Sequence, residues 1–266
     1  MMPEFLGYEF MQRALVGGVL GGGALSFLGL YVVLRRLVFL GAALPQFSAF
    51  GIAGAALVEL PPLLGAVVGA VLGVTFLPVL RMEGRLPPDG VVGIGYALTS
   101  SLAILLLAFA DDHHFRPELL LAGDLLGISA ADLWIVGGAV LATALLHLLC
   151  WRTFKLTSSD PELASALGYR VKVWDALLFL SLGIVLAVVM RISGAIVTFA
   201  YLVGPSSAAL LLFRRFSLII PVTIVLGAMG TVAGLWASFT FDLPGGPTVA
   251  AAVVLPVVPA VIYRYL

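Results

Sequence analysis

The sequence predicts an all-α protein, a polytopic bundle of transmembrane helices that forms a single domain over residues 1–266. Hydrophobic residues make up 62% of the chain and charged residues only 11%, whereas about a quarter of the residues in a soluble domain are charged. The apolar residues also gather in runs of roughly 20, the length that a helix needs to cross a hydrocarbon core of about 30 Å. A soluble globular protein is therefore excluded.

Taken in order, nine apolar runs are long enough to span a bilayer. They cover residues 10–34, 38–58, 62–80, 91–110, 131–151, 172–191, 194–213, 217–239 and 247–263. The links at Leu60-Pro61-Pro62 and at Arg191-Ile192-Ser193-Gly194 are very short. Because a tight turn and a kink look alike in sequence, eight spans are the alternative to nine.

The basic residues indicate the side of the membrane on which each link lies, because short cytoplasmic loops collect Lys and Arg. Eleven of the fourteen Lys and Arg residues follow odd-numbered spans and share one side, and nine of the fourteen Asp and Glu residues fall on the other. This separation predicts an N-terminus outside and a C-terminus in the cytoplasm. It also predicts that the polar stretch 158–171 is cytoplasmic.

That polar stretch, which follows the fifth span, predicts a short helix. We expect Ser158 and Ser159 to cap its first amides. Asp160 and Glu162 would lie where the helix dipole favours anions, and Pro161 suits the first helical turn. The residues at the start of the stretch therefore agree on where the helix begins.

Gly168 would end this helix, because glycine readily adopts the left-handed conformation that follows many helices. The segment would then project from the membrane between two hydrophobic spans, and we interpret 158–171 as a docking helix. A proton-driven carrier usually needs ionisable side chains inside the membrane, and His147 is the one clear case here. We interpret His147 as a packed side chain, so we expect the docking partner to be an ATPase that supplies the energy.

Glycines spaced four residues apart predict closely packed helices. They form the pairs Gly17/Gly21 and Gly18/Gly22 in the first span and the series Gly65, Gly69 and Gly73 in the third. Packing within one subunit is our main interpretation, and a dimer interface is the alternative. The single cysteine, Cys150, cannot form an internal disulfide, and we interpret it as structural.

Five segments follow one another over nearly the whole chain. They are FMQRALVGGVLGGGALSFLGLYVVLRRLVFLG (10–41), LLLAGDLLGISAADL (119–133), SSDPELASALGYRV (158–171), RISGAIVTFAYLVGPSSAALLLFRR (191–215) and FDLPGGPTV (241–249). The most specific are Asp-Pro-Glu followed by Ala-Leu-Gly in the third segment and Asp-Leu-Pro-Gly-Gly-Pro-Thr in the last. Together they resemble the permease subunit of the zinc/manganese-uptake ABC transporter family.

The resemblance implies an importer of a divalent metal cation, zinc or manganese, in the plasma membrane of a prokaryote. The implied partners are two cytoplasmic ATPase subunits, an extracytoplasmic substrate-binding protein, a second permease that makes a homodimer or a mixed pair, and membrane lipid, with no nucleic acid. ATP would be bound by the partner subunit, the metal would be the substrate, and this chain would hold no cofactor. Because the family's cytoplasmic loop enters a groove of the ATPase, the match assigns coupling to Asp160, Pro161, Glu162, Ala166, Leu167 and Gly168.

The sequence departs from the family pattern at the start of the second span. The family typically reads Leu-Gly-Asp-Ala-Leu-Ser-His there, and this chain reads Leu-Gly-Ala-Ala-Leu-Pro-Gln over residues 40–46. Ala42 and Gln46 thus replace an aspartate and a histidine, and an amide binds Zn²⁺ or Mn²⁺ poorly. Three explanations stay open: the metal passes hydrated, a second permease supplies the ligands, or the substrate has changed.

Pro45 is expected to kink the second span and to free backbone carbonyls toward a cavity. We therefore expect Pro45, Gln46 and Ser48 to line the transport pathway, along or near the subunit interface. Ordinary hydrogen bonds between helices are the alternative interpretation of Gln46 and Ser48.

The predicted external loop holds adjacent acidic and histidine side chains, Asp111-Asp112-His113-His114. Adjacent residues cannot all face one ion without an irregular backbone, so a solvated loop is our main interpretation. The alternative is a weak metal site at His113 and His114, close to a docked binding protein. Asp242 is expected to fix a turn before the last span.

Other functional classes lack their sequence signals. The chain has no His-Glu-x-x-His or Gly-x-Ser-x-Gly pattern of a hydrolase and no Gly-x-x-x-x-Gly-Lys-Ser/Thr phosphate loop, so we do not expect an enzyme. An ATP-independent channel or facilitator is an alternative, because backbone and neutral side chains can line a pore. Such a protein would not need a docking helix.

Overall fold

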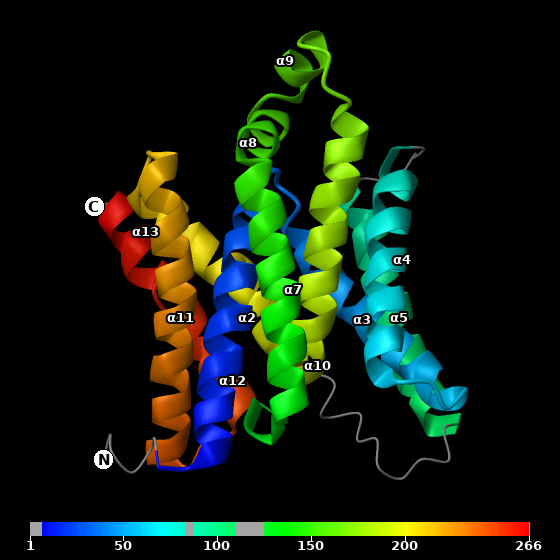
Figure 1. Ribbon diagram of the computed structural model, residues 1–266, viewed down its shortest axis with the longest axis vertical. Helices are drawn as coiled ribbons and strands as arrows, with labels where there is room; N and C mark the ends of the chain where they lie inside the picture. The colour runs from blue at the N-terminus through cyan, green and yellow to red at the C-terminus, as the bar shows by residue number, and fades with distance from the viewer. Residues whose placement is uncertain (1–6, 83–87, 110–124, 266) are drawn as a thin grey trace.

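The computed structural model describes residues 7–82, 88–109 and 125–265, and within these ranges it contains helices and no strand (Figure 1). The all-α prediction is confirmed. The α-helices are α2 (Glu9–Leu34), α3 (Val38–Leu57), α4 (Pro62–Met82), α5 (Pro88–Phe109), α7 (Ala130–Leu149), α8 (Trp151–Ser159), α9 (Pro161–Ala166), α10 (Val171–Leu212), α11 (Phe216–Phe241), α12 (Gly245–Val254) and α13 (Val257–Tyr265), and η1 (Leu125–Gly127) is a short 3₁₀ helix.

Seven stretches of helix in the described part of the chain are long and apolar enough to cross a membrane. They lie in α2, α3, α5, α7, α10 and α11 and in the segment Gly245–Arg264, which covers α12 and α13. Helix α4 (Pro62–Met82) is described with its side chains only over Pro62–Thr75, which is an apolar stretch. A polytopic helical bundle is therefore confirmed, and the count of nine spans stays a prediction.

Helix α10 is two helical segments joined at Gly194. The backbone angles of Gly194 (φ 77°, ψ 170°) are not helical and belong to a region that only glycine adopts readily. The Thr198 hydroxyl donates to the carbonyl of Gly194 at 2.7 Å, and the Ser193 hydroxyl donates to the carbonyl of Val189 at 2.8 Å. These side chains bond backbone groups on both sides of the break.

The chain crosses the bundle twice within α10. Its first segment starts beside α9 and runs to Arg191, whose Nη1 lies 2.9 Å from Oδ1 of Asp132, at the start of α7 and at the opposite end of the bundle. After α10, helix α11 begins at Phe216, and the Lys155 ammonium of α8 lies 5.4 Å from the centre of its ring. The Arg191–Gly194 link is therefore a reversal of direction rather than a kink (Figure 1).

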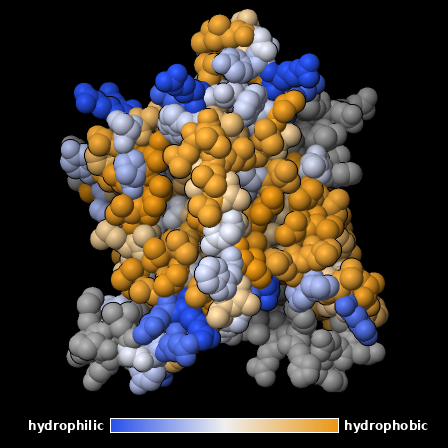
Figure 2. All heavy atoms as spheres, in the orientation of Figure 1, coloured by the Kyte–Doolittle hydropathy of each residue, from blue (hydrophilic) through white to orange (hydrophobic). Residues whose placement is uncertain are grey.

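Basic residues that we expect on one side of the membrane also share one end of the bundle. Arg35 contacts Ser158, Lys155 contacts Phe216, and Arg264 donates to the carbonyl of Leu211. Ion pairs Arg13–Glu9 and Arg191–Asp132 lie at the other end. Figure 2 shows hydrophilic side chains toward the upper and lower ends and a mainly hydrophobic band between them. Which end faces the cytoplasm stays a prediction.

The glycine series bring helices of one subunit into close contact. A Cβ atom on Gly18 would lie 2.7 Å from Cγ2 of Thr231 in α11, and a Cβ atom on Gly22 would overlap the ring of Tyr201 in α10. On α3 and α4, Cβ atoms on Gly51 or Gly65 would overlap the backbone carbonyl of the other residue. Packing within one subunit is confirmed for these glycines.

Candidate functional site

Helix α9 begins one residue after Asp160, whose Oδ1 accepts a hydrogen bond from the Leu163 amide at 2.9 Å. Pro161 occupies the start of the helix, as predicted. The expectation that Ser158 and Ser159 cap this helix is wrong, because both belong to the last turn of α8. A carboxylate at the cap also interacts more favourably with the helix dipole than a hydroxyl does.

Gly168 ends α9, as predicted. Its φ of 86° is left-handed, its amide donates to the carbonyl of Ser165, and the next amide, that of Tyr169, donates to the carbonyl of Ala164. This pair of bonds is the Schellman arrangement, which satisfies the last carbonyls of a helix. The short helix therefore has a defined start and a defined end although it has only six residues.

The surface of α9 exposes apolar side chains. The side chains of Leu163, Leu167 and Tyr169 are 48%, 62% and 42% exposed, whereas Ala164 is buried and faces the rest of the protein. The helix lies at the tip of the molecule, beyond the ends of α7 and α10 (Figure 1). Exposed apolar residues at a projecting tip are typical of interaction surfaces, and a docking role for this tip stays a prediction.

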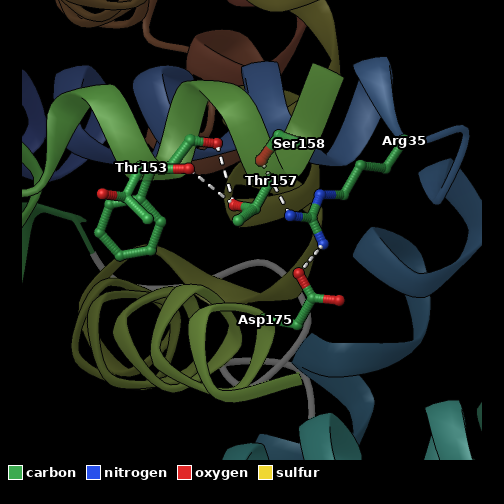
Figure 3. A network of polar contacts seen from close by, with 6 residues as sticks. Arg35, Thr153, Thr157, Ser158 and Asp175 are labelled. Carbon is green, nitrogen blue, oxygen red and sulfur yellow. Dashed lines mark hydrogen bonds and ion pairs between the residues drawn. The ribbon is translucent and has the colours of Figure 1, made fainter. Parts of the chain in front are cut away.

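Arg35 fixes the base of this tip. Its Nη1 donates to Oδ1 of Asp175 in α10 at 2.7 Å, and its Nη2 donates to Oγ of Ser158 in α8 at 2.8 Å (Figure 3). The guanidinium also lies 5.8 Å from the centre of the Phe179 ring. Arg35 follows directly after α2, so one side chain connects α2 to the helices on both sides of α9.

His147 is packed inside the bundle, as predicted. Its ring stacks on Phe154 with 4.3 Å between centres and meets Phe27 edge-on. Its Nε2 lies 3.1 Å from Oγ of Ser181, and that hydroxyl donates to the carbonyl of Leu178. Because the Ser181 proton is already used, the serine oxygen accepts the bond and His147 is the donor.

The predicted pathway residues lie on α3, which packs against α4, α5 and α10. Pro45, Gln46 and Ser48 are all buried. The Ser48 hydroxyl donates to the carbonyl of Ala66 in α4 at 3.1 Å, which is an ordinary hydrogen bond between helices. Ala42 lies one turn before Gln46, so the two positions share one face of α3. Their role in the pathway stays a prediction.

A metal-binding cluster is not found in the part of the chain that the structure describes: no three His, Cys, Asp or Glu side chains there come together. The predicted weak site at His113 and His114 lies outside the described residues. Asp242 adopts a left-handed conformation (φ 52°, ψ 44°) at the end of α11. It marks the turn before the last predicted span, as expected.

The sequence analysis missed Leu163, Tyr169, Arg35 and Asp175. Leu163 lies between the two parts of the matched motif and Tyr169 follows it, and their exposure could have been inferred only from the projection of α9. Arg35 is one of the eleven basic residues that indicate orientation. A pair of arginines after a span gives no sign that one of them will contact residues about 120 to 140 positions further along the chain.

Comparisons with known proteins agree with the architecture. A family model described as the ABC 3 transport family matches residues 7–264. The manganese transport system membrane protein MntC of Listeria monocytogenes is 29% identical over 246 residues, which cover 90% of this chain and 85% of that protein. The chelated iron transport system membrane protein YfeD of Yersinia pestis is 28% identical over 271 residues, which cover 100% of this chain and 89% of that protein.

A solved structure, PsaBC from Streptococcus pneumoniae in complex with Fab, matches with a TM-score of 0.87 and 25% identity, covering 98% of this chain and 95% of the matched chain. The resemblance found from the motifs is confirmed by these matches. With the apolar helices, the family match over nearly the full length shows that this multi-pass integral membrane protein belongs to the ABC 3 transport family.

Proposed function

We propose that the chain is the membrane-spanning permease subunit of an ATP-driven importer of a divalent metal cation in a prokaryotic plasma membrane. A separate cytoplasmic ATPase would bind and hydrolyse ATP, and an extracytoplasmic binding protein would deliver the metal. Two permease subunits, identical or different, would form the pathway between them. Zinc and manganese are the cargo that the family resemblance implies, and the names of the relatives support manganese and add iron.

The projecting helix α9 carries this proposal. Leu163 on α9, and Leu167 and Tyr169 directly after it, are exposed at one end of the bundle. Burying a leucine side chain against a partner stabilises a complex by about 1.5–3 kcal/mol. Asp160, Pro161, Glu162, Ala166, Leu167 and Gly168 would then form the coupling surface, with Leu163 and Tyr169 as additional contacts.

The missing Asp and His of the second span limit what is proposed for the pathway. Ala42 offers no ligand, and the buried Gln46 offers a neutral amide. A hydrated metal, ligands from a second permease and a changed substrate all agree with these side chains. The motifs and the relatives favour a metal cargo, and a non-metal substrate is the outcome to which a negative transport experiment would lead.

The test is uptake of radiolabelled Mn²⁺, Zn²⁺ and Fe²⁺ into vesicles that contain the permease and its co-encoded ATPase, with and without ATP. We expect ATP-dependent accumulation of at least one metal. Leu167→Asp should weaken binding of the ATPase about tenfold or more, and Glu162→Arg should abolish uptake. Ser159→Asp adds a charge at an exposed residue just before α9 and should leave uptake unchanged.

Three other results would change the proposal. Metal uptake without ATP would indicate a channel or facilitator. Uptake that survives both Leu167→Asp and Glu162→Arg would show that α9 is not the coupling helix. If no metal moves while the ATPase still binds, the permease assignment stands and the metal cargo is wrong.

A further inference from the structure

An apolar groove with a volume of about 660 Å³ runs along the outer face of the bundle between α2, α7 and α11. Helix α2 packs against both α7 and α11 and forms its floor. In Figure 1, α2 lies between these two helices on the face turned to the viewer. Small residues, Gly23 on the floor with Ala144 and Ala228 on the walls, leave the space open.

The groove opens onto the hydrophobic surface of the protein. Leu148 on α7 lines it and is 74% exposed, and Ile224 on α11 lines it and is 39% exposed. On α7 the lining residues run from Val140 to Leu148, about 12 Å along the helix axis, and Trp151 at the start of α8 continues the lining beyond that end. This length is close to half of the hydrocarbon thickness, about 15 Å, so the groove matches one acyl chain of one leaflet.

Cationic side chains lie at the end of the groove near α8. Lys155 follows Trp151, a lining residue, by one turn of α8, and Phe216 precedes Ile220, another lining residue, by one turn of α11. The Lys155 ammonium lies 5.4 Å from the centre of the Phe216 ring, so it sits where the two walls meet. Within the described residues neither Lys155 nor the exposed Arg152 makes an ion pair.

We propose that this groove binds an anionic phospholipid, with one acyl chain along α2 and the phosphate at Lys155 and Arg152. Each basic residue close to the membrane surface favours an anionic headgroup severalfold. Trp151 lies at the end of the apolar lining, next to Arg152 in the sequence, and tryptophan residues concentrate at the boundary between the hydrocarbon core and the headgroups. The site concerns the outer face of the protein and does not depend on the cargo.

A second copy of the chain fits this face poorly. A two-fold interface brings the same patch of each subunit together, and two concave grooves facing each other would enclose an empty space. The same symmetry would bring Lys155 and Arg152 close to their own copies, and like charges repel. A flexible acyl chain with an anionic headgroup meets neither difficulty.

The experiment measures lipid binding to the purified permease–ATPase complex by native mass spectrometry. The probes are phosphatidylglycerol and phosphatidylcholine with identical acyl chains, added in equal amounts. The wild-type complex should prefer phosphatidylglycerol. Lys155→Gln should reduce this preference about fivefold, and adding Arg152→Gln should remove it. Arg36→Asn, which removes an exposed charge at the same end of the bundle, should leave the preference unchanged.

A matched pair of substitutions tests the acyl-chain part of the site. Ala144 lines the groove, whereas Ala142, two residues earlier on α7, is exposed and does not line it. Ala144→Phe should fill the groove and lower binding of both lipids severalfold. Ala142→Phe adds the same ring outside the groove and should change neither.

The proposal is overturned if Lys155→Gln leaves the preference for phosphatidylglycerol at its wild-type value. It is also overturned if the Ala144→Phe variant binds each lipid as well as the Ala142→Phe variant does. If instead Ala144→Phe separates permease dimers while lipid binding is unchanged, a second copy of the chain covers the groove.

Discussion

Arg35 connects three helices through a single guanidinium group. The planar fork of arginine can hold two acceptors at fixed positions, which the single ammonium of lysine cannot do. Here the acceptors are Ser158 and Asp175, one on each side of α9. A force on α9 therefore reaches α2 through two hydrogen bonds, of which the bond to Asp175 is an ion pair.

We predict that Arg35→Ala uncouples transport from ATP hydrolysis. The variant should still bind the ATPase and keep basal hydrolysis, while metal uptake per ATP falls severalfold, because α9 keeps its docking surface but loses its connection to α2. Arg35→Lys should recover only part of the uptake. The measurement is the ratio of metal accumulated to ATP hydrolysed in reconstituted vesicles.

Arg36→Asn is the matched control for Arg35→Ala. Arg36 is exposed and has a φ of 56°, which asparagine tolerates better than most residues. The exchanged pair Arg35→Asp with Asp175→Arg tests the contact itself and should restore part of the lost coupling. Equal losses in Arg35→Ala and Arg36→Asn would mean that the charge matters and the contacts do not.

At the scale of one element, α10 shows how two antiparallel spans are joined with almost no loop. The reversal occupies one residue with non-helical angles, Gly194. The hydroxyls of Ser193 and Thr198 bond to nearby carbonyls, and they lie 3.3 Å apart. Such a compact link is possible only where the backbone can reach conformations that a side chain would forbid.

We predict that Gly194→Ala destabilises the protein by about 1–3 kcal/mol, the usual cost of a strained backbone conformation. Thermal unfolding of the purified protein in detergent, followed by circular dichroism, should show a lower midpoint. Gly138→Ala is the control, because that glycine lies in the regular helix α7 and a Cβ there meets nothing within 4 Å. A Gly194→Ala midpoint equal to that of Gly138→Ala would contradict the role of the reversal.

The ends of several long helices could be predicted from the sequence, because a hydrophobic run stops where polar or charged residues begin. The run 10–34 is Glu9–Leu34 in the structure, and the run 38–58 is Val38–Leu57. The cap of α9 was predicted wrongly, because both Ser158 and Asp160 are good capping residues and only the extent of α8 decides between them. The link at Gly194 was ambiguous because a tight turn and a kink look alike in sequence.

The candidate site was only partly predictable. The motif in 158–171 identified α9 because its capping and terminating residues are local in sequence. Arg35, Asp175 and Ser158 come together only in the folded bundle. A local sequence pattern does not predict a contact between Arg35 and residues so far away in the sequence. The apolar groove depends on which faces of α2, α7 and α11 stay uncovered, which is a property of the whole packing.

At the scale of the whole molecule, the charges are sorted between the two ends of the bundle. Among the described residues, Arg35, Lys155 and Arg264 lie at the end that carries α9, and the ion pairs Arg13–Glu9 and Arg191–Asp132 lie at the other. By the rule that cytoplasmic loops are rich in Lys and Arg, we predict that α9 is inside the cell. The same rule places the start of α2 outside.

The predicted orientation can be tested with single cysteines, because Cys150 is the only native one. In a Cys150→Ala background, Leu243→Cys should react in intact cells with a thiol reagent that does not cross membranes. Ser165→Cys on α9 should react only after the membrane is permeabilised. Both residues are exposed, so reactivity reports the side of the membrane rather than burial. The reverse pattern of labelling would invert the topology.

The contact between α3 and α4 limits how the bundle can change shape. Gly51 and Gly65 place backbone directly against backbone, and Gly69 lies equally close to the carbonyl of Phe47. Helices usually slide past one another by small rotamer changes of the side chains between them, and at these three glycines backbone meets backbone with no side chain of their own in between. We therefore expect α3 and α4 to move together as one rigid unit. If Gln46 lines the pathway, we predict that opening and closing there change the contacts of α3 with α5 or α10 and not its contact with α4.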